Sequence, residues 1–402
     1  MNFNSNTIGK VYELRTLPEK ESGKKPCARS GHRCVADKTR LYVFGGYNPN
    51  IETLKRYYDD FNAEDIETII PLFDELWEFN FATSRWKKMS TSGPMPTELA
   101  SMAMILVGST VIVYGGTGYP FGITSSNKIY TLSTKSLEWR CHEPEEYSPV
   151  PTYGCAISVN EGNVYTYGGT TGWSYISNVD RYNMQSGEWT SMYDSSTDWL
   201  HHFSDPHDHV TSPRPRYRHE MLSDQNNLYV LGGGTSGEAY ELDIIYIFNL
   251  QTKTWKKHQS KNDEVHGYPA NRRCFGCCQL KDHAYISGGL NERKMHDDIW
   301  RLSLQDCQWT KCSAKLLFPL YFHASAVTPA GCMYIHGGVK TLTGDKRSLK
   351  LSRIWLVVPN LLELCWSKVL HLIPKIQRMS VPQLWQLGIP QELIERLDYE
   401  DH

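Results

Sequence analysis

Long apolar runs are missing from this sequence. No stretch of about 18 or more apolar residues occurs, so nothing predicts a membrane-spanning helix. Residues 1–10 are polar and lack the apolar core of a secretory signal peptide. The 11 cysteines are scattered without the spacing of a disulfide framework, which favours a reducing compartment. We therefore expect a soluble intracellular protein, cytoplasmic and also compatible with the nucleus.

An excess of charge of one sign is missing as well. The chain has 42 Lys and Arg against 44 Asp and Glu, so no overall field favours nucleic acid or an anionic membrane. It also has no Gly-x-Ser-x-Gly elbow, no phosphate-binding glycine-rich loop before a helix and no His-Glu-x-x-His. We expect neither an enzyme nor a bound cofactor, and no nucleic-acid or membrane partner.

The sequence does contain a short β-rich run ending in two glycines, and this unit occurs six times at intervals of about 50 to 70 residues, a period typical of propellers. β-branched and aromatic residues suit a pleated, half-buried surface, and glycines permit the positive φ of a turn. The six pairs are Gly45-Gly46, Gly115-Gly116, Gly168-Gly169, Gly232-Gly233, Gly288-Gly289 and Gly337-Gly338.

Each unit predicts a four-stranded blade. A further strand follows most glycine pairs, and a polar turn then leads to a strand that carries a tryptophan, at Trp86, Trp139, Trp189, Trp255 and Trp309. Six blades imply a closed ring, which protects the strand edges. The sixth unit lacks its tryptophan strand, because the chain leaves the ring after residues 354–358. We expect residues 10–14 to supply the missing strand, and residues 1–358 to form the propeller.

This pattern resembles the kelch repeat over roughly residues 10 to 358, which implies an all-β, six-bladed kelch propeller. Some propellers that resemble kelch rings are copper oxidases with a tyrosine–cysteine–histidine centre, but the secretory context expected for those is missing here. Two other features invite a metal interpretation. The insertion at residues 191–215 holds His201, His202, His207 and His209, and residues 274–278 contain a Cys-x-x-Cys. A polar loop and buried structural cysteines explain both more simply, so we predict no metal site.

After Pro359 the apolar period becomes helical, and residues 359–402 are predicted to form a tail of three short helices. Residues 361–369 resemble the elongin-binding BC box, Leu-x-x-x-Cys-x-x-x-aliphatic. The resemblance implies that elongin C contacts Leu361, Leu364, Cys365 and Val369. Leu361, Cys365 and Val369 lie about one helical turn apart, as a helix that enters a partner's groove requires.

A cullin box of the type apolar-Pro-x-x-apolar-x-x-x-apolar fits the tail in two registers. The first uses Val381, Pro382, Trp385 and Ile389, and the second uses Ile389, Pro390, Leu393 and Leu397. The match favours a cullin of the second type over the fifth. The alternative is that the tail is only a helical cap on the propeller.

A kelch ring followed by such a box resembles the kelch-domain-containing substrate receptors of elongin–cullin ubiquitin ligases. The phrases that carry this likeness are residues 28–35, 216–220, 231–236, 328–338 and 354–359. It implies elongin B and elongin C as partners, a cullin, and client proteins recognised through C-terminal tails that end in glycine or alanine. The alternative function is a non-catalytic kelch scaffold that binds actin or regulates a signalling enzyme.

A candidate site for client tails comes from aligning the repeats on the first glycine of each pair. About sixteen positions earlier stand Arg29, Leu99, Thr152, Arg216, Arg272 and Tyr321, with Arg218 and His323 two positions further on. We expect these arginines to converge on one mouth of the channel, where guanidinium groups grip a C-terminal carboxylate. The apolar part of the tail would lie against Tyr153, Tyr217 and Tyr321. The alternative is that the arginines tie neighbouring blades together.

Overall fold

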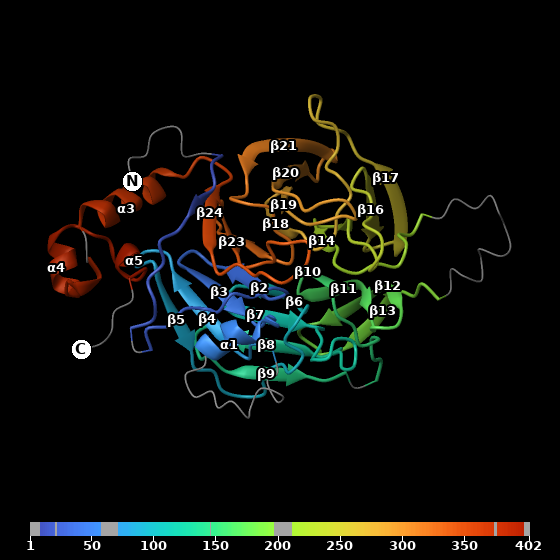
Figure 1. The fold of residues 1–402 in the computed structure, drawn as a ribbon, viewed down its shortest axis with the longest axis horizontal. Helices are drawn as coiled ribbons and strands as arrows, with labels where there is room; N and C mark the ends of the chain where they lie inside the picture. The colour runs from blue at the N-terminus through green and yellow to red at the C-terminus, as the bar shows by residue number, and fades with distance from the viewer. Residues whose placement is uncertain are drawn as a thin grey trace.

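The computed structural model describes residues 9–20, 22–57, 71–144, 146–196, 211–373 and 376–397. Within them, 24 strands form six four-stranded antiparallel sheets, which are arranged as blades around a central channel (Figure 1). The all-β, six-bladed propeller expected from the sequence is confirmed. No helix in these ranges is long and apolar enough to cross a membrane. His201, His202, His207 and His209 lie outside the described residues.

In each of the first five blades the strands run outward from the channel in chain order. The first three blades are β2 (Arg33–Ala36), β3 (Arg40–Phe44), β4 (Leu76–Asn80) and β5 (Arg85–Met89); β6 (Ala103–Val107), β7 (Thr110–Tyr114), β8 (Ile129–Ser133) and β9 (Trp139–His142); and β10 (Ala156–Asn160), β11 (Asn163–Thr170), β12 (Tyr175–Asn183) and β13 (Trp189–Tyr193). The fourth and fifth are β14 (Glu220–Ser223), β15 (Asn227–Leu231), β16 (Ile244–Asn249) and β17 (Thr254–Gln259); and β18 (Gly276–Leu280), β19 (His283–Ser287), β20 (Asp298–Ser303) and β21 (Gln308–Lys315).

The sixth blade joins the two ends of the propeller. It contains β22 (Ala324–Val327), β23 (Cys332–His336), β24 (Leu351–Trp355) and, as its outermost strand, β1 (Tyr12–Glu13). Tyr12 pairs with Arg353 and Glu13 with Ser352 in an antiparallel ladder. The N-terminal segment thus lies where the sixth blade was expected to lack a strand, and it removes the exposed edge that β24 would otherwise present.

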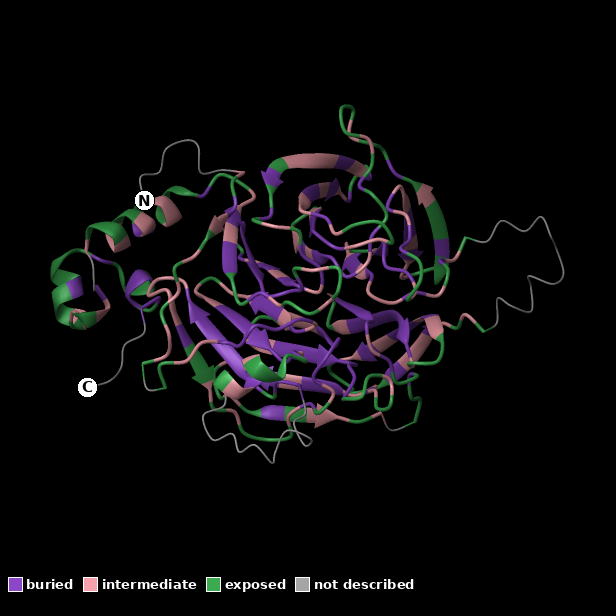
Figure 2. Cartoon of the chain, viewed as in Figure 1, coloured by how far each residue is buried: buried purple, intermediate pink, exposed green. Residues whose placement is uncertain are grey.

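The core lies between adjacent blades, and the second strand of each blade is almost entirely buried (Figure 2). The tryptophans expected on outer strands fill these junctions: Trp139 lies 5.0 Å from the Phe44 ring of the preceding blade, and Trp255 lies 5.3 Å from Tyr167. The glycine pairs permit equally close contact. Gly45 has a φ of 69°, and a Cβ there would lie 2.6 Å from the Leu99 carbonyl oxygen of the next blade.

Helices occur mainly in the tail, at the left of Figure 1. They are α3 (Leu361–Leu372), the 3₁₀ turn η3 (Ile376–Arg378), α4 (Val381–Gln386) and α5 (Gln391–Ile394); a further helix, α1 (Ile51–Tyr57), lies in the first insertion. The tail has its own small core around Trp366, Leu384 and Ile394. This core touches the first blade through Ala82, and Asn80 donates a hydrogen bond of 3.1 Å to the Arg396 carbonyl.

Candidate functional site

Six residues at the start of the innermost strands form a closed collar around the channel. The backbone N–H of each residue donates a hydrogen bond of 2.7 to 3.1 Å to the carbonyl of the equivalent residue in the preceding blade. The ring closes because Gly31 of the first blade donates to Phe322 of the sixth. We call this ring the collar; its members are Gly31, Ser101, Gly154, Arg218, Cys274 and Phe322. All six have positive φ, between 54° and 68°. Such a conformation is costly for Arg218 and Phe322, and strain of this kind often marks functional positions.

The arginines of the aligned position do not reach the channel. Arg29, Arg216 and Arg272 are fully buried, and each donates from Nη1 to the carbonyl of the first glycine of its own blade's pair, at 2.8 to 3.0 Å. Arg29 also pairs with Glu75 at 2.8 Å, and Arg272 pairs with Asp298 at 2.7 Å. The prediction that these three line a funnel is therefore wrong, because each is held within its own blade. These contacts do not tie neighbouring blades together, as the alternative proposed, but stabilise a single blade.

His323 also needs correction, because the count of sixteen positions is one residue out in the sixth blade. Phe322, not His323, is the collar residue equivalent to Arg218. His323 is buried at the junction of the fifth and sixth blades, where it hydrogen-bonds the Ser287 hydroxyl at 2.9 Å. It is not available to a ligand at the mouth.

One residue precedes each collar member in its repeat, and in four of the six blades this residue has a large side chain. Tyr153, Tyr217 and Tyr321 occupy equivalent positions, because each forms an isolated bridge with a residue that follows its glycine pair. The structure therefore brings the three predicted tyrosines to one rim. Sequence reasoning missed Arg273, the fourth member, whose guanidinium donates to the carbonyls of Thr235 and Ser236. Alignment on the collar position, rather than on the buried arginines, would have found it.

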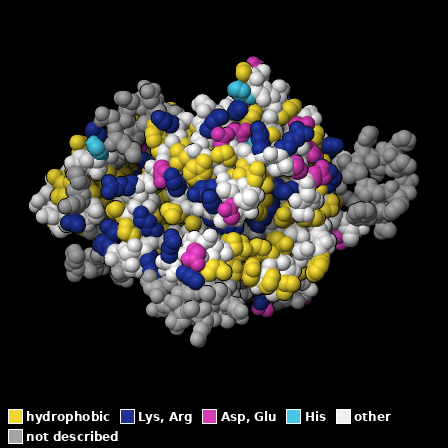
Figure 3. Space-filling view, viewed as in Figure 1, with side chains coloured by type: hydrophobic (Ala, Val, Ile, Leu, Met, Phe, Trp, Pro, Cys, Tyr) yellow, Lys and Arg dark blue, Asp and Glu magenta, His cyan; other side chains and the backbone are white. Residues whose placement is uncertain are grey.

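Arg218 is a collar residue, and no carboxylate among the described residues pairs with it. Its guanidinium lies 4.4 Å from the centre of the Phe322 ring, and its buried Nε has no hydrogen-bond partner in that part of the chain. Burial lowers the pKa of Arg218 from its usual value, as expected for an uncompensated cation. Burial has the same effect on the pKa of Arg347, which stacks on Tyr47 and donates to the Ser30 hydroxyl at 2.9 Å. Figure 3 shows Lys and Arg side chains near the middle of this view of the ring, bordered by hydrophobic ones.

The mouth has a floor. Arg33 of the first blade and Glu220 of the fourth, which stand opposite each other in the ring, form an ion pair of 2.8 Å across the channel. The cavity between this pair and the collar measures only about 20 Å³, enough for about one water molecule. A ligand can therefore end at the mouth but cannot thread the channel.

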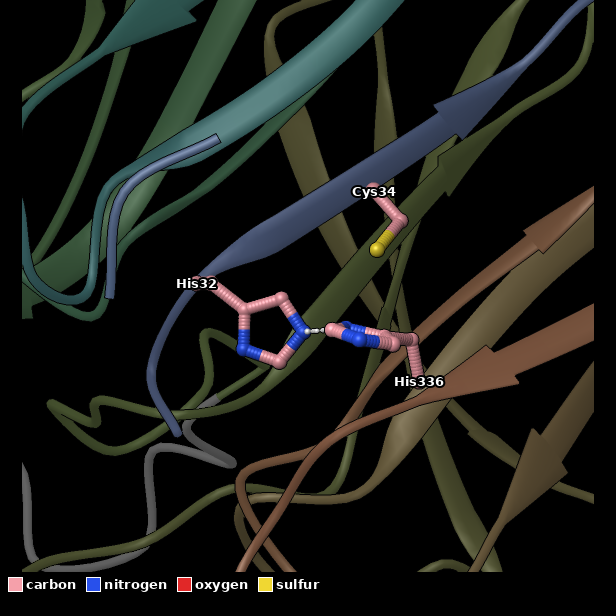
Figure 4. Close-up of side chains that lie close together, drawn as sticks. All are labelled: His32, Cys34 and His336. Carbon is pink, nitrogen blue, oxygen red and sulfur yellow. Dashed lines mark hydrogen bonds between the residues drawn. The ribbon is translucent and has the colours of Figure 1, made fainter. Parts of the chain in front are cut away.

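His32, Cys34 and His336 are the described residues that come closest to a metal-binding set, with ligand atoms within 4.8 Å of one another (Figure 4). His336 Nδ1 and His32 Nε2 already hydrogen-bond each other at 3.0 Å, and burial lowers the pKa values of both rings. The same two positions of neighbouring blades hold Ser287 and His323, also hydrogen-bonded. We therefore assign His32 and His336 to the packing between blades.

The predicted elongin-binding face of α3 is largely uncovered. Leu361 is 74% exposed and Cys365 is also exposed, whereas Leu364 is half-buried and Val369 packs against the tail core. The opposite face carries Trp366, which is 4% exposed, so packing fixes the helix without using Leu361 or Cys365. Asn360 caps the helix by accepting the Glu363 N–H at 2.9 Å.

The two cullin-box registers differ in exposure. In the first, Pro382 and Trp385 are exposed, Trp385 by 57%, while Val381 is half-buried and Ile389 is buried. In the second, only Pro390 is exposed, because Ile389, Leu393 and Leu397 form the core of the tail itself. Exposure therefore favours the first register as a surface for a partner.

Comparison with known proteins agrees with this architecture. A family model described as the KLHDC2/KLHL20/DRC7 Kelch-repeats domain matches residues 10–198 and 200–376. The chain is 43% identical to rat Kelch domain-containing protein 10 over 97% of its own length and 90% of the rat protein's. It is 45% identical to the human protein of that name, over 92% and 80% of the two chains. The Drosophila melanogaster homologue is 34% identical, over 92% of this chain and 62% of the relative.

Proposed function

This chain belongs to the Kelch domain-containing protein 10 family, and we propose that it is a non-catalytic substrate receptor of a cullin-RING ubiquitin ligase. In this proposal the propeller binds the C-terminal tails of client proteins, and the helical tail binds elongin C and a cullin. The observation that carries the first part is a cation without a carboxylate partner among the described residues, Arg218, at the mouth of a channel with a closed floor.

A C-terminal carboxylate matches this mouth in charge and in shape. A guanidinium forms short, charge-assisted hydrogen bonds with a carboxylate, and the Arg218 guanidinium has no carboxylate partner among the described residues. The floor formed by Arg33 and Glu220 favours the end of a chain over an internal segment, because a chain cannot continue past it. Tyr153, Tyr217 and Tyr321 would contact the preceding residues of the tail. The resemblance to kelch-domain-containing substrate receptors implies that the final residue of the tail is glycine or alanine.

The tail supports the second part of the proposal. Burying Leu361 in an elongin groove would contribute roughly 1.5–3 kcal/mol, and its 74% exposure here leaves that surface to be covered. Elongin B would join through elongin C. Pro382 and Trp385 would face a cullin, for which the second type is our choice.

The client-binding part is tested by titrating a glycine-ended peptide and its C-terminally amidated twin into the wild type and Arg218→Ala. We expect amidation and Arg218→Ala each to weaken binding about ten- to hundredfold, the range for hydrogen bonds to charged groups. The affinity of the amidated peptide should fall little further when Arg218→Ala is introduced, because amidation and the substitution remove the same contact. Arg140→Ala, which removes an exposed arginine on the second blade, is the charge-matched control. Equal affinity of the wild type for both peptides would rule out a carboxylate anchor.

The ligase part is tested by copurification. Leu361→Ala combined with Cys365→Ala should abolish copurification of elongins while leaving the melting temperature unchanged, because both side chains are exposed. Leu349→Ala, which truncates a leucine that is 61% exposed on the propeller, is the matched control. Normal recovery of elongins with the double variant would show that the box has been misidentified, and would favour a kelch scaffold with a structural cap.

A further inference from the structure

A second cationic site lies where the tail meets the propeller, far from the channel mouth. A cleft of about 320 Å³ separates α3 from the first and sixth blades, a volume within the range of small-molecule pockets. Its propeller wall includes Phe81 and Tyr334, which stack at 4.3 Å, and its tail wall includes Trp366. Figure 3 shows several Lys and Arg side chains gathered beside the tail.

The charges that line this cleft do not balance. Four cationic side chains, Arg15, Lys38, Arg353 and Arg396, face a single carboxylate, Glu363. Glu363 pairs with Arg396 at 2.9 Å, and Arg396 is 6% exposed. The other three cations have no carboxylate partner among the described residues. Arg353 is half-buried and hydrogen-bonds the Tyr334 hydroxyl, which is a neutral partner.

A half-buried arginine without a carboxylate partner is unfavourable unless an anion completes its environment. The packing of the described tail residues does not supply one, because their only carboxylate in the cleft is already paired. We propose that this cleft binds a small phosphorylated molecule carrying two or more negative charges, with Arg353 as the central ligand and Arg15 and Lys38 as flanking ones. The planar guanidinium of Arg353 matches a phosphate group, and Lys38 adds a second charge from an exposed turn.

Bound there, the phosphorylated molecule would contact both walls of the cleft. The propeller contributes Arg15, Lys38 and Arg353, and α3 contributes its Trp366 and His371 face. The ligand would therefore hold the tail against the propeller, with a set angle between the channel mouth and the exposed face of α3. This inference does not depend on whether the mouth binds client tails.

The experiment is a calorimetric titration of the full chain with inorganic tripolyphosphate at low and high salt. We expect saturable binding that weakens with salt, as for partly exposed charges. Arg353→Gln should weaken it at least about tenfold, and Lys38→Gln and Arg15→Gln should each weaken it less. The last two side chains are exposed, so these variants test the site even if Arg353→Gln unfolds the sixth blade. Lys135→Gln, an exposed charge on the second blade, is the matched control and should bind normally.

Two results would overturn the proposal. One is the absence of saturable binding, or binding that the three cleft variants leave unchanged. The other concerns Asp398, Glu400 and Asp401, three acidic residues that follow Leu397 in the sequence. If tripolyphosphate binds only to a variant that combines Asp398→Asn, Glu400→Gln and Asp401→Asn, the chain's own acidic end is the occupant of the cleft and not a phosphorylated molecule.

Discussion

Removal of residues 1–17 should open the propeller, because β1 is the outermost strand of the sixth blade. The deletion removes Val11, which is 7% exposed and packs with Met333, Ile335 and Ile354. Burial of one valine contributes roughly 1.5–3 kcal/mol. The deletion also removes backbone hydrogen bonds to the sixth blade, such as Leu14 to Leu351 at 2.9 Å, and each contributes about 0.5–1.5 kcal/mol.

The deletion should therefore lower the free energy of unfolding by about 3–5 kcal/mol, because it removes the contacts between the N-terminal segment and the sixth blade that close the ring. Each kcal/mol lowers the melting temperature by about 2–4 °C in chains of roughly 150–250 residues and by less in larger ones. We expect a fall of roughly 5 °C. We also expect self-association, because the unpaired edge of β24 becomes a template for another strand.

Circular dichroism melts and light scattering on a sizing column measure the two effects. Deletion of residues 1–8 is the matched control, since it leaves the strand in place. Glu13→Gln should also matter little, because the pair between Glu13 and Lys350 is exposed. If the variant lacking residues 1–17 has the same melting temperature as the variant lacking residues 1–8 and stays monomeric, β1 does not contribute to the stability of the closed ring.

The remaining predictions concern buried charges. Burial raises the pKa of Asp180 to about 6, so the folded state holds its proton more tightly than the unfolded chain, and stability is lost as pH rises from about 4 to 6. Asp180→Asn should therefore stabilise the protein by up to about 3 kcal/mol at pH 7.5 and by little near pH 4. An equal gain in the free energy of unfolding at the two pH values would show that the ionised Asp180 carboxylate is not its cause. Arg29 and Trp77 hold the pKa of Glu75 at about 2, so Arg29→Met should destabilise the first blade by about 3–5 kcal/mol at neutral pH. That loss should shrink as pH falls below 4, since Glu75 in the variant takes up a proton; denaturant titrations at pH 7 and pH 3.5 measure it, and a pH-independent loss would refute the pairing.

Much of the fold could be predicted because its signals are local. The alternation of apolar residues before each glycine pair marks β3, β7, β11, β15, β19 and β23 without any knowledge of their neighbours. The tail was equally clear, because its apolar residues change to a helical period after Pro359. The missing sixth tryptophan strand was enough to indicate that the N-terminal segment returns to the last blade.

The candidate site was predicted only in part. Tyr153, Tyr217, Tyr321 and Arg218 were placed at the mouth, but so were three arginines that lie inside the blades. An arginine near the start of an inner strand has the same sequence signature whether it binds a glycine carbonyl or faces the channel. A one-residue error in the sixth repeat was enough to exchange Phe322 for His323. In the tail, the second cullin register could not be distinguished from the tail's own core until its packing was known.

The sequence by itself therefore determined the number of blades, the strand that closes them and the helical tail, because each follows from a periodicity along the chain. The tertiary structure alone decided which cations are available to a ligand. The collar residues are Gly, Ser, Gly, Arg, Cys and Phe, and share only a left-handed backbone and a hydrogen bond to the next blade. No residue type marks that position, so its place at the channel appears only when the ring is closed. The same holds for the cleft beside α3, whose cations come from segments more than 300 residues apart and meet only through packing of the tail.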